Sequence, residues 1–451
     1  MKVNVAGAGA GKTTKMAELI TGIDIPDGKV IFCIAFTNAA AENIEEKVIS
    51  NLGKLPDNIR ISTIHSFLYQ ELIKPYYYFL YGKQFESLSV IDLPDKKSYK
   101  QTKLSCLEDE GILHYTKIPE KAKWVAYKRS GDRKAIKDTR ATILKRFSDY
   151  CAAIYVDEAQ DISEDVRHVL EPLDAAGVEI ILYGDPKQDV KGQGKFREII
   201  NKTDSVNYIA ECHRCPQKHL NLSNLLACDS EKQIADADKT DGSIEVFFES
   251  DIENIEAFLA GGDYGLQYIS SKRDRFDTHE KHEGKNQFKN LHHEVRRNMI
   301  KKWQSIKSEI EVERAAFYVT ESMQKDYDDG KEASVIISNW IGKKAFDRLG
   351  RKEYAQMAEA FNVEKNEDTK AIVVSSIEKI KGLEAKRCLF ILTTDLAPYL
   401  FRENTEDNKM SHLCYVALTR SLDNLTILVT KEVEEKYTKI KIKEFFESYV
   451  R

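Results

Sequence analysis

A glycine-rich stretch near the N-terminus most constrains how this chain can fold. The ten residues AGAGAGKTTK (Ala6–Lys15) follow an alternating, strand-like segment and precede the pattern of a helix start. A strand, a loop of small residues and then Gly-Lys-Thr at a helix N-terminus is the arrangement of a phosphate-binding loop. The alternative is an ordinary glycine- and alanine-rich turn between a strand and a helix. On the first interpretation, the stretch predicts a site for nucleotide phosphates.

The residue types of this loop match what phosphate binding requires. Gly7, Gly9 and Gly11 have no side chain, so the backbone N–H groups of the loop can point at phosphate oxygens. Lys12 would place a positive charge at the β- and γ-phosphates, and the Thr13 hydroxyl would ligate Mg²⁺. The expected cofactors are therefore ATP and Mg²⁺. The loop residues expected to bind them are Ala8, Gly9, Ala10, Gly11, Lys12, Thr13 and Thr14.

Two apolar segments further along the chain end in polar residues suited to the same chemistry. CAAIYVDEAQDIS (Cys151–Ser163) reads as a strand that delivers Asp157 and Glu158 at its carboxyl end, where ligands bind in α/β sheets. Asp157 would hold Mg²⁺, mostly through water, and Glu158 would orient and deprotonate an attacking water. A solvated acidic turn is the competing interpretation. The strand-like VEIILYGDPKQ (Val178–Gln188) adds Gln188, which is placed to sense a γ-phosphate.

These segments belong to a longer series of motifs. The others are AFTNAAAENI (Ala35–Ile44), STIHSF (Ser62–Phe67), ECHRCP (Glu211–Pro216), SSIEKIKGLE (Ser375–Glu384) and YVALTRS (Tyr415–Ser421). The series resembles the motifs of UvrD/Rep-like superfamily 1 DNA helicases, in that family's order. ECHRCP stands where the family has an Asn-Tyr-Arg-Ser element, and YVALTRS is close to the family's final motif. The segments between the motifs are not covered by the resemblance.

The resemblance implies an α/β fold with two RecA-like P-loop domains, each built on a parallel sheet, and ATP in the cleft between them. The first domain would comprise residues 1–67 and 147–205, with an accessory insertion at residues 68–146. The second would comprise residues 206–270 and 367–451, with a reduced, mostly helical insertion at residues 271–366. That insertion contains His279, His282, His292 and His293 without cysteines or ligand spacing, so we expect solvated surface there rather than a metal site.

The resemblance also implies nucleotide contacts from the second domain. Arg214 and Arg420 would reach across the cleft to the γ-phosphate. They would complete a catalytic set with Lys12, Asp157, Glu158 and Gln188. Gly382 would approach the phosphates, Glu384 the ribose hydroxyl, and His213 stands where the family has an adenine-stacking tyrosine, which leaves the choice between ATP and GTP open. A structural ion pair is the alternative for Arg214, and a surface arginine is the alternative for Arg420.

Single-stranded DNA is the partner that the resemblance implies. The residues expected to contact it are Phe36, Thr37, Asn38, Thr63 and His65. Phe36 would stack on a base and the others would hold backbone phosphates. A core position is the alternative for Phe36, because this residue follows an apolar strand. The basic stretch Lys121–Arg146, with Trp124 and Tyr127, also suits single strands, but for a charge run a solvated helical face is the slightly favoured interpretation.

The DNA-facing positions depart from the family's pattern more than the nucleotide-facing ones do. Glu378 replaces a histidine and places a negative charge where a phosphate should pass. After GDPKQ the family has base-stacking aromatic residues, whereas here only Phe196 is near. We therefore expect the nucleotide machinery to be kept and the DNA track to be partly rewritten.

Two functional classes are consistent with these motifs. The first is an ATP-dependent helicase or translocase that moves 3′→5′ on single-stranded DNA. The second is a nucleotide-hydrolysing subunit that works with a separate nuclease or sensor. The helicase-like subunit of Gabija-type anti-phage systems is of this second kind, and Ser66–Gly82 loosely resembles its layout. No nuclease motif is visible in the chain, so any cutting would come from a partner.

Composition limits the remaining possibilities. The chain has 451 residues, enough for two or three domains, with 42% hydrophobic and 31% charged residues. The net charge of −5 argues against a generally basic coat for nucleic acid, but it is compatible with a local basic track. Eight scattered cysteines predict reduced thiols and a cytoplasmic protein. No apolar run is long enough to cross a membrane, so we expect no membrane partner.

Overall fold

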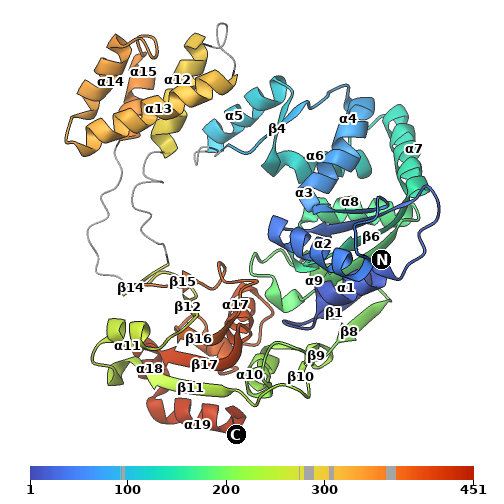
Figure 1. The fold of residues 1–451 in the computed structure, drawn as a ribbon, viewed down its shortest axis with the longest axis vertical. Coiled ribbons are helices and arrows are strands. Elements are labelled where there is room, and N and C mark those ends of the chain that lie inside the picture. Colours follow the sequence, from blue (N-terminus) through green and yellow to red (C-terminus); the bar gives the residue numbers. More distant parts are fainter. Residues whose placement is uncertain are drawn as a thin grey trace. The chain divides into compact units, whose positions relative to one another are not determined.

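The computed structural model describes residues 1–91, 93, 97–273, 275–278, 289–303, 309–361 and 372–450. Contacts within the chain divide it into two compact units, Met1–Ser271 with Ser375–Arg451, and Lys272–Val374. The first unit contains two separate parallel sheets, and we call each sheet with its helices a lobe (Figure 1). The predicted α/β class with parallel sheets is confirmed.

The first lobe is built on a six-stranded sheet with the strand order β3-β2-β6-β7-β1-β8, all parallel. Its central strands are continuous apolar runs because both faces of the sheet are covered. Phe32 and Ile34 belong to the core on the face of helix α8, whereas Ile31 and Cys33 belong to the core on the face of α1 and α2. The strands are β1 (Lys2–Ala6), β2 (Val30–Ala35), β3 (Ile59–Thr63), β6 (Cys151–Val156), β7 (Glu179–Gly184) and β8 (Val206–Ile209).

Helices connect these strands and cover both faces of the sheet (Figure 1). They are α1 (Lys12–Thr21), α2 (Asn38–Leu52), α8 (Glu164–Ala175) and α9 (Lys195–Lys202). In the parallel register Val5 pairs with Gly184, and Ile34 pairs with Val156. The loops that follow β1, β6 and β7 therefore meet at one edge of the sheet. This edge carries the polar residues singled out in the sequence.

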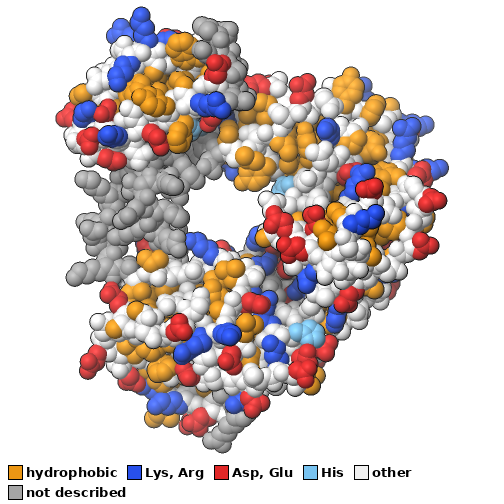
Figure 2. Space-filling model, in the orientation of Figure 1, with side chains coloured by type: hydrophobic (Ala, Val, Ile, Leu, Met, Phe, Trp, Pro, Cys, Tyr) orange, Lys and Arg blue, Asp and Glu red, His pale blue; other side chains and the backbone are white. Residues whose placement is uncertain are grey.

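A mostly helical insertion separates β3 from β6. It contains α3 (Ile64–Phe67), the π-helix η1 (Leu68–Ile73), α4 (Lys74–Tyr81), β4 (Ser87–Ser89), α5 (Lys97–Asp109), β5 (Ile112–His114), α6 (Ile118–Ala126) and α7 (Lys134–Tyr150). Its tyrosine-rich stretch supplies core, since Tyr77 is buried with its ring centroid 5.4 Å from that of Phe85. The neighbouring Tyr78 and Phe79 are exposed, and Figure 2 shows hydrophobic side chains over α4.

The second lobe is built on a five-stranded parallel sheet with the order β11-β17-β16-β12-β15. Its strands are β11 (Ser243–Phe248), β12 (Leu266–Ile269), β15 (Ser375–Ser376), β16 (Ala385–Leu392) and β17 (Ser421–Val429). The helices packed around it include α10 (Gln217–Ser223), α17 (Lys409–Leu418), α18 (Lys431–Tyr437) and α19 (Lys439–Val450). A separate two-stranded sheet pairs β9 (Glu211–Cys212) with β10 (Ile234–Ala235). In the chain, α10 lies between the two strands of this small sheet, and β11 follows them.

The second unit is helical and has its own core. Its elements are β13 (Phe276–Asp277), α12 (Lys289–Trp303), α13 (Glu309–Asp328), α14 (Ala333–Gly342), α15 (Arg351–Glu359) and β14 (Ile372–Val373). Buried apolar side chains from all four helices, such as Val295, Met323 and Ile337, form this core. The predicted domain boundary at residues 366/367 lies outside the described residues, as do His279 and His282. Within the described part of the chain, no helix is long and apolar enough to span a membrane.

Candidate nucleotide site

The glycine-rich loop joins the end of β1 to the start of α1, as its sequence predicts. Gly9 and Gly11 have φ angles of 71° and 70°, a left-handed conformation that residues with a side chain rarely adopt. At Gly9 there is also no room for a side chain, because an added Cβ would lie 2.2 Å from the Cβ of Arg214. The loop therefore depends on glycine both for its turn and for a close approach of the second lobe.

Lys12 begins helix α1 and turns its amine back over the loop. Its Nζ donates hydrogen bonds to the carbonyl oxygens of Ala6 and Gly7, at 3.3 and 3.4 Å. The side chain is 9% exposed, so the amine lies at the loop rather than in open solvent. These long bonds to two carbonyls keep a cation where the phosphates of a bound nucleotide would be held.

Thr13 and Asp157 bring two oxygen ligands together. The Thr13 hydroxyl donates to the Asp157 carboxylate at 2.7 Å, and Asp157 also accepts from the Glu158 backbone N–H at 2.9 Å. Burial and the neighbouring charge of Glu158 raise the pKa of Asp157 to about 6, against the opposing effect of Lys12. A hydroxyl beside a buried carboxylate fits Mg²⁺, which prefers hard oxygen ligands and would relieve the burial of the carboxylate charge.

Glu158 has a constrained position at the end of β6. Its φ angle is 54°, the left-handed region that a glutamate rarely adopts and that costs about 1 kcal/mol or more. Its carboxylate accepts a hydrogen bond from the side-chain amide of Gln160, which is completely buried. The other end of that amide accepts from the Asp185 backbone N–H at 3.0 Å. Gln160 thereby ties the ends of β6 and β7 together and fixes Glu158 between them.

The segment after β7 forms a buried polar cluster. Gln188 donates to the Asp185 carboxylate at 2.9 Å, and the Lys187 amine lies 3.0 Å from the same carboxylate and 3.4 Å from Glu231. Burial acts to raise the pKa of Asp185, but the charges of Lys187 and Lys12 outweigh it and bring the pKa to about 2. Gln188, the expected γ-phosphate sensor, is therefore held by Asp185 at this edge of the sheet.

The second lobe reaches the loop through the segment after β9. The His213 backbone N–H donates to the Gly9 carbonyl at 2.9 Å, and Arg214 follows directly against Gly9. The Arg214 Nε atom lies 2.6 Å from the Glu384 carboxylate, so the two predicted nucleotide contacts are paired with each other. Gly382, which is also expected to contact nucleotide from this lobe, has a φ angle of 89°.

Arg420 lies in a different environment from Arg214. It is completely buried, and its guanidinium donates to the carbonyl oxygens of Val416 and Leu383, at 3.1 and 3.4 Å, and to the Thr419 hydroxyl at 3.0 Å. Burial and the nearby charge of Arg214 lower the pKa of Arg420. In this structure its own lobe therefore holds Arg420, so it is not the surface arginine of the alternative interpretation.

The remaining predicted nucleotide contacts lie around the start of α1. The His213 ring is half-exposed, and its Nδ1 lies 2.6 Å from the Asp236 carboxylate. An added Cβ at Gly11 would lie 3.6 Å from this ring, so His213 is next to the loop. The Thr14 hydroxyl accepts from Lys47 at 2.9 Å. Among the described residues, the exposed Glu211 and His213 and the partly buried Asp236 form one group whose ligand atoms lie within 4.8 Å of one another.

Three further residues touch the loop and carried no prediction as site residues, and one of them is Cys212, whose thiol donates to the Ala8 carbonyl at 3.1 Å. The Ala8 backbone N–H donates to the Tyr415 hydroxyl at 3.2 Å, and the Gln233 side chain donates to the Ala8 carbonyl at 3.1 Å. Tyr415 begins the YVALTRS motif, so its position in a motif was a signal that could have identified it. Gln233 lies in no motif and follows no pattern, so the sequence offered no signal for it.

The residues expected to contact DNA lie at the ends of β2 and β3. The hydroxyls of Thr37 and Thr63 cap helices α2 and α3, accepting from the N–H groups of Ala40 and Ser66 at 3.1 and 3.3 Å. Each hydroxyl still has its own proton to donate to a phosphate. Phe36 is partly buried against the core on the α8 face of the sheet, and Asn38 is exposed.

His65 is less suited to a phosphate than its residue type indicates. It is partly buried, and burial together with the charge of Lys191 lowers its pKa. A neutral imidazole can bind a phosphate only as a hydrogen-bond donor. The Tyr115 ring lies 6.3 Å away and is exposed, which adds an aromatic surface beside it.

Several residues considered for the DNA track are paired or buried within the protein. Glu378 forms an ion pair with Lys409 at 2.5 Å, and Phe196 is buried rather than available for stacking. In the basic stretch, Lys123 pairs with Asp165 at 2.5 Å and Arg140 with the buried Asp132 at 2.7 Å. On the face drawn in Figure 2, acidic and basic side chains are interspersed over the first unit.

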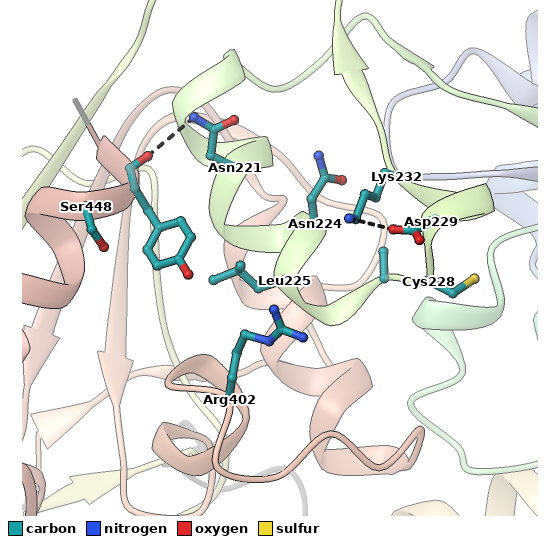
Figure 3. A pocket seen from close by; sticks show the side chains of 10 residues that line it. Asn221, Asn224, Leu225, Cys228, Asp229, Lys232, Arg402 and Ser448 are labelled. Atoms are coloured by element: carbon teal, nitrogen blue, oxygen red, sulfur yellow. Dashed lines mark hydrogen bonds and ion pairs between the residues drawn. The ribbon is translucent and has the colours of Figure 1, made fainter.

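A surface pocket lies apart from this site, between α10, α19 and Arg402 (Figure 3). Its volume is about 540 Å³. The ten side chains that line it include Asn221, Asn224, Lys232, Arg402 and Tyr449, but none from the phosphate-binding loop. The pocket is therefore not the nucleotide site.

Comparison with known proteins gives a match for the N-terminal part of the chain. Residues 1–193 match the family described as AAA domain. No curated protein matches the chain. Among solved structures it is similar to the arterivirus nonstructural protein 10 helicase in complex with DNA, with 12% identity and a TM-score of 0.37 over 95% of this chain and 60% of that one. A second is the PRRSV helicase, with 9% identity and a TM-score of 0.34 over 95% of this chain and 52% of that one. The chain thus spans about half to three fifths of the length of these two proteins.

Proposed function

We propose that this chain hydrolyses ATP with Mg²⁺ and uses the cycle to move along single-stranded DNA, as a helicase or translocase of the UvrD type with 3′→5′ polarity. The observation that carries the proposal is the 2.7 Å hydrogen bond between Thr13 and Asp157, directly beside Glu158. A glycine-rich loop, a hydroxyl, a carboxylate for the metal and a carboxylate for the base are the parts that phosphoryl transfer to water requires. The match of residues 1–193 to an AAA domain supports the nucleotide-binding part.

Each residue has a defined task in this proposal. Lys12 leaves the carbonyls of Ala6 and Gly7 and binds the β- and γ-phosphates, while the N–H groups of Gly9 to Thr13 hold phosphate oxygens. Thr13 and Asp157 would hold Mg²⁺, which supplies charge neutralisation at the phosphates. Glu158, positioned by Gln160, accepts the proton of the attacking water.

The second lobe supplies positive charge to the same reaction. Arg214 lies against Gly9 and would exchange its partner Glu384 for the γ-phosphate. Such arginines typically accelerate hydrolysis by about 10³–10⁵. Arg420, which its own lobe holds in this structure, would also be directed to the γ-phosphate. The arginines come from the second lobe, whereas Lys12 and Glu158 come from the first. Hydrolysis therefore depends on how the two lobes meet, and this dependence would couple the chemistry to movement.

A second candidate function is a partner-regulated ATPase subunit of a nuclease-containing anti-phage complex. The altered DNA track favours this second candidate. The side chain of Lys409 is paired with Glu378 rather than free for a DNA phosphate, and Phe196 is buried rather than free to stack on a base. On this reading the nucleotide site is intact, but DNA is not its main activator.

Steady-state hydrolysis separates the two candidates. ATP and GTP turnover by the purified chain is measured with Mg²⁺, with and without single-stranded DNA, beside the Lys12→Ala variant as the inactive control. Strong stimulation by DNA supports the motor, and unwinding of duplexes with a 3′ rather than a 5′ tail supports the polarity. Turnover that ignores DNA supports the partner-regulated subunit. If turnover is equal in the wild type and Lys12→Ala, the nucleotide site itself is wrongly assigned.

A further inference from the structure

Three hydrogen bonds enclose the peptide groups of Ala8 in the phosphate-binding loop. The Ala8 N–H donates to the Tyr415 hydroxyl at 3.2 Å, this hydroxyl donates to the Gln233 side-chain oxygen at 2.8 Å, and the Gln233 amide donates to the Ala8 carbonyl at 3.1 Å. The three bonds form a closed ring from one lobe to the other. We call Tyr415 and Gln233 the clasp.

The clasp is shielded from water. Tyr415, Gln233 and Ala8 are 1%, 2% and 1% exposed. Burial raises the pKa of Tyr415, so its hydroxyl stays protonated and remains a donor. When one member of the ring is removed, the remaining groups lose a buried hydrogen bond that water does not replace, while the Ala8 carbonyl keeps the Cys212 thiol as a donor at 3.1 Å.

Gly7 shows independently that the loop is shaped to receive Gln233. An added Cβ at Gly7 would lie 2.1 Å from the Gln233 side-chain carbon, whereas its φ angle does not lie in the left-handed region. The left-handed backbone thus accounts for glycine at positions 9 and 11, whereas the close approach of Gln233 accounts for glycine at position 7. The backbone of Gln233 is itself fixed, because it exchanges two hydrogen bonds of 2.8 Å with the Asn224 side chain.

Each half of the clasp is connected to one of the two arginines. Tyr415 lies on α17, five residues before Arg420, whose Nε donates to the Val416 carbonyl of the same helix. Gln233 directly precedes β10, which pairs with β9, and β9 leads into His213 and Arg214. The clasp therefore connects the loop at Ala8 to both arginine-bearing segments.

We propose that Tyr415 and Gln233 are positioning residues that lock the phosphate-binding loop to the second lobe and thereby place Arg214 and Arg420 for hydrolysis. The proposal rests on the function proposed above, since it assigns regulation to that same nucleotide site. Neither residue touches the reacting atoms. The clasp is expected to act on turnover, with little effect on the initial binding of nucleotide.

The test compares Tyr415→Phe and Gln233→Met with Tyr69→Phe as a matched control. Tyr69 is buried too, and its hydroxyl donates to the Phe85 carbonyl at 3.2 Å within the first insertion, so its removal deletes a comparable bond elsewhere. We expect each clasp variant to lower the kcat for ATP at least about tenfold with KM changed by less than about threefold. The double variant should be no worse than the more affected single variant, because the ring acts as a unit. Tyr69→Phe should leave kcat unchanged.

A second readout does not depend on hydrolysis. Hydrogen exchange at the Ala8 amide, followed by mass spectrometry of the loop peptide without nucleotide, should be faster in both clasp variants and unchanged in Tyr69→Phe. If the wild type fails to hydrolyse ATP, the proposed function fails while exchange still reports on the clasp. Unchanged exchange overturns the clasp itself. Faster exchange with unaltered kcat in an active enzyme, or an equal loss of kcat in Tyr69→Phe, overturns its positioning role.

Discussion

The Arg214 guanidinium and the Glu384 carboxylate lie 2.6 Å apart in the second lobe. The sequence motifs assign both residues to bound nucleotide, one to the γ-phosphate and the other to the ribose. In this structure each is the partner of the other, with side chains 19% and 46% exposed. An ion pair this exposed contributes about 0–1 kcal/mol to stability, so breaking it when nucleotide binds costs little free energy.

We expect Arg214→Ala to lower kcat by about 10³-fold, because it removes positive charge from the developing transition state. The melting temperature should fall by no more than about 2 °C, since the pair is weak. Steady-state kinetics and a thermal melt of the same preparation measure both. Glu384→Gln is the control for loss of the ion pair alone, and it should mainly raise KM. An Arg214→Ala enzyme with the turnover of the wild type would leave Arg214 with only its structural pairing.

Glu158→Gln should remove hydrolysis while nucleotide binding persists. Glutamine keeps the size of the side chain and can still accept from Gln160, but it cannot take a proton from water. General-base catalysis contributes about 10²–10⁴-fold, so kcat should fall by that factor. Turnover is measured by phosphate release, and binding by titration with a fluorescent ATP analogue. Lys12→Ala serves as the contrasting variant that should lose both, and a Glu158→Gln variant with near-normal turnover would contradict the assignment of the base.

Thr13→Val should increase the Mg²⁺ concentration needed for half-maximal hydrolysis. The substitution keeps the shape of the side chain but deletes the hydroxyl that lies 2.7 Å from Asp157. Thr21→Val at the far end of α1 is the matched control, because the Thr21 hydroxyl donates to the Glu18 carbonyl at 3.0 Å on the protein surface. Chelation of divalent cations should abolish turnover of every variant. An unchanged Mg²⁺ requirement in Thr13→Val would remove Thr13 from the metal site.

The centre of the first lobe's sheet was predictable because β2, β6 and β7 are buried on both faces. Such strands are continuous apolar runs in the sequence. The polar residue that ends a strand, such as Asp157, directly follows its run, so one short segment predicts both the strand and the site residue. Gln233 was not predictable, since its partner Ala8 is 225 residues away and no local pattern records that contact. The roles of Thr37 and Thr63 as helix caps were also missed, because a capping hydroxyl and a phosphate-binding hydroxyl look the same in a sequence.

Arg420→Ala should affect both the fold and the reaction. Arg420 is completely buried and donates to two carbonyls and a hydroxyl, and each of these three groups loses a buried hydrogen bond in the variant. We expect the free energy of unfolding to fall by at least about 2 kcal/mol, as for lost hydrogen bonds to a charged group. Turnover should be lost even at temperatures where chemical denaturation shows the variant to be folded. Normal turnover in the folded variant would mean that Arg420 stabilises the second lobe without completing the site.

The contact between the lobes at His412 should weaken as the pH rises. The His412 ring lies 2.9 Å from the Asp189 carbonyl and 2.6 Å from the Asp407 carboxylate, and both of these groups accept hydrogen bonds. Both ring nitrogens must therefore donate, which only the protonated imidazole can do. Burial acts to lower the pKa of His412, but the hydrogen bond to Asp407 outweighs it, so the pKa is raised above 6.5. Arg197, which also faces Asp407 at 3.0 Å, is cationic throughout this range.

A raised pKa in the folded state fixes the sign of this effect. The stabilisation by His412 is fully present below the pKa of an unfolded histidine, about 6.5, and is lost as the pH rises through the higher folded value. The difference in the free energy of unfolding between the wild type and His412→Gln should thus be largest near pH 6 and shrink towards pH 9. His219→Gln is the control of opposite sign, because burial lowers the pKa of His219, whose Nε2 lies 3.0 Å from the Ser243 carbonyl. Chemical denaturation across this pH range measures both differences. A His412→Gln difference that stays constant, or that grows with pH, would show that His412 is not protonated between the lobes.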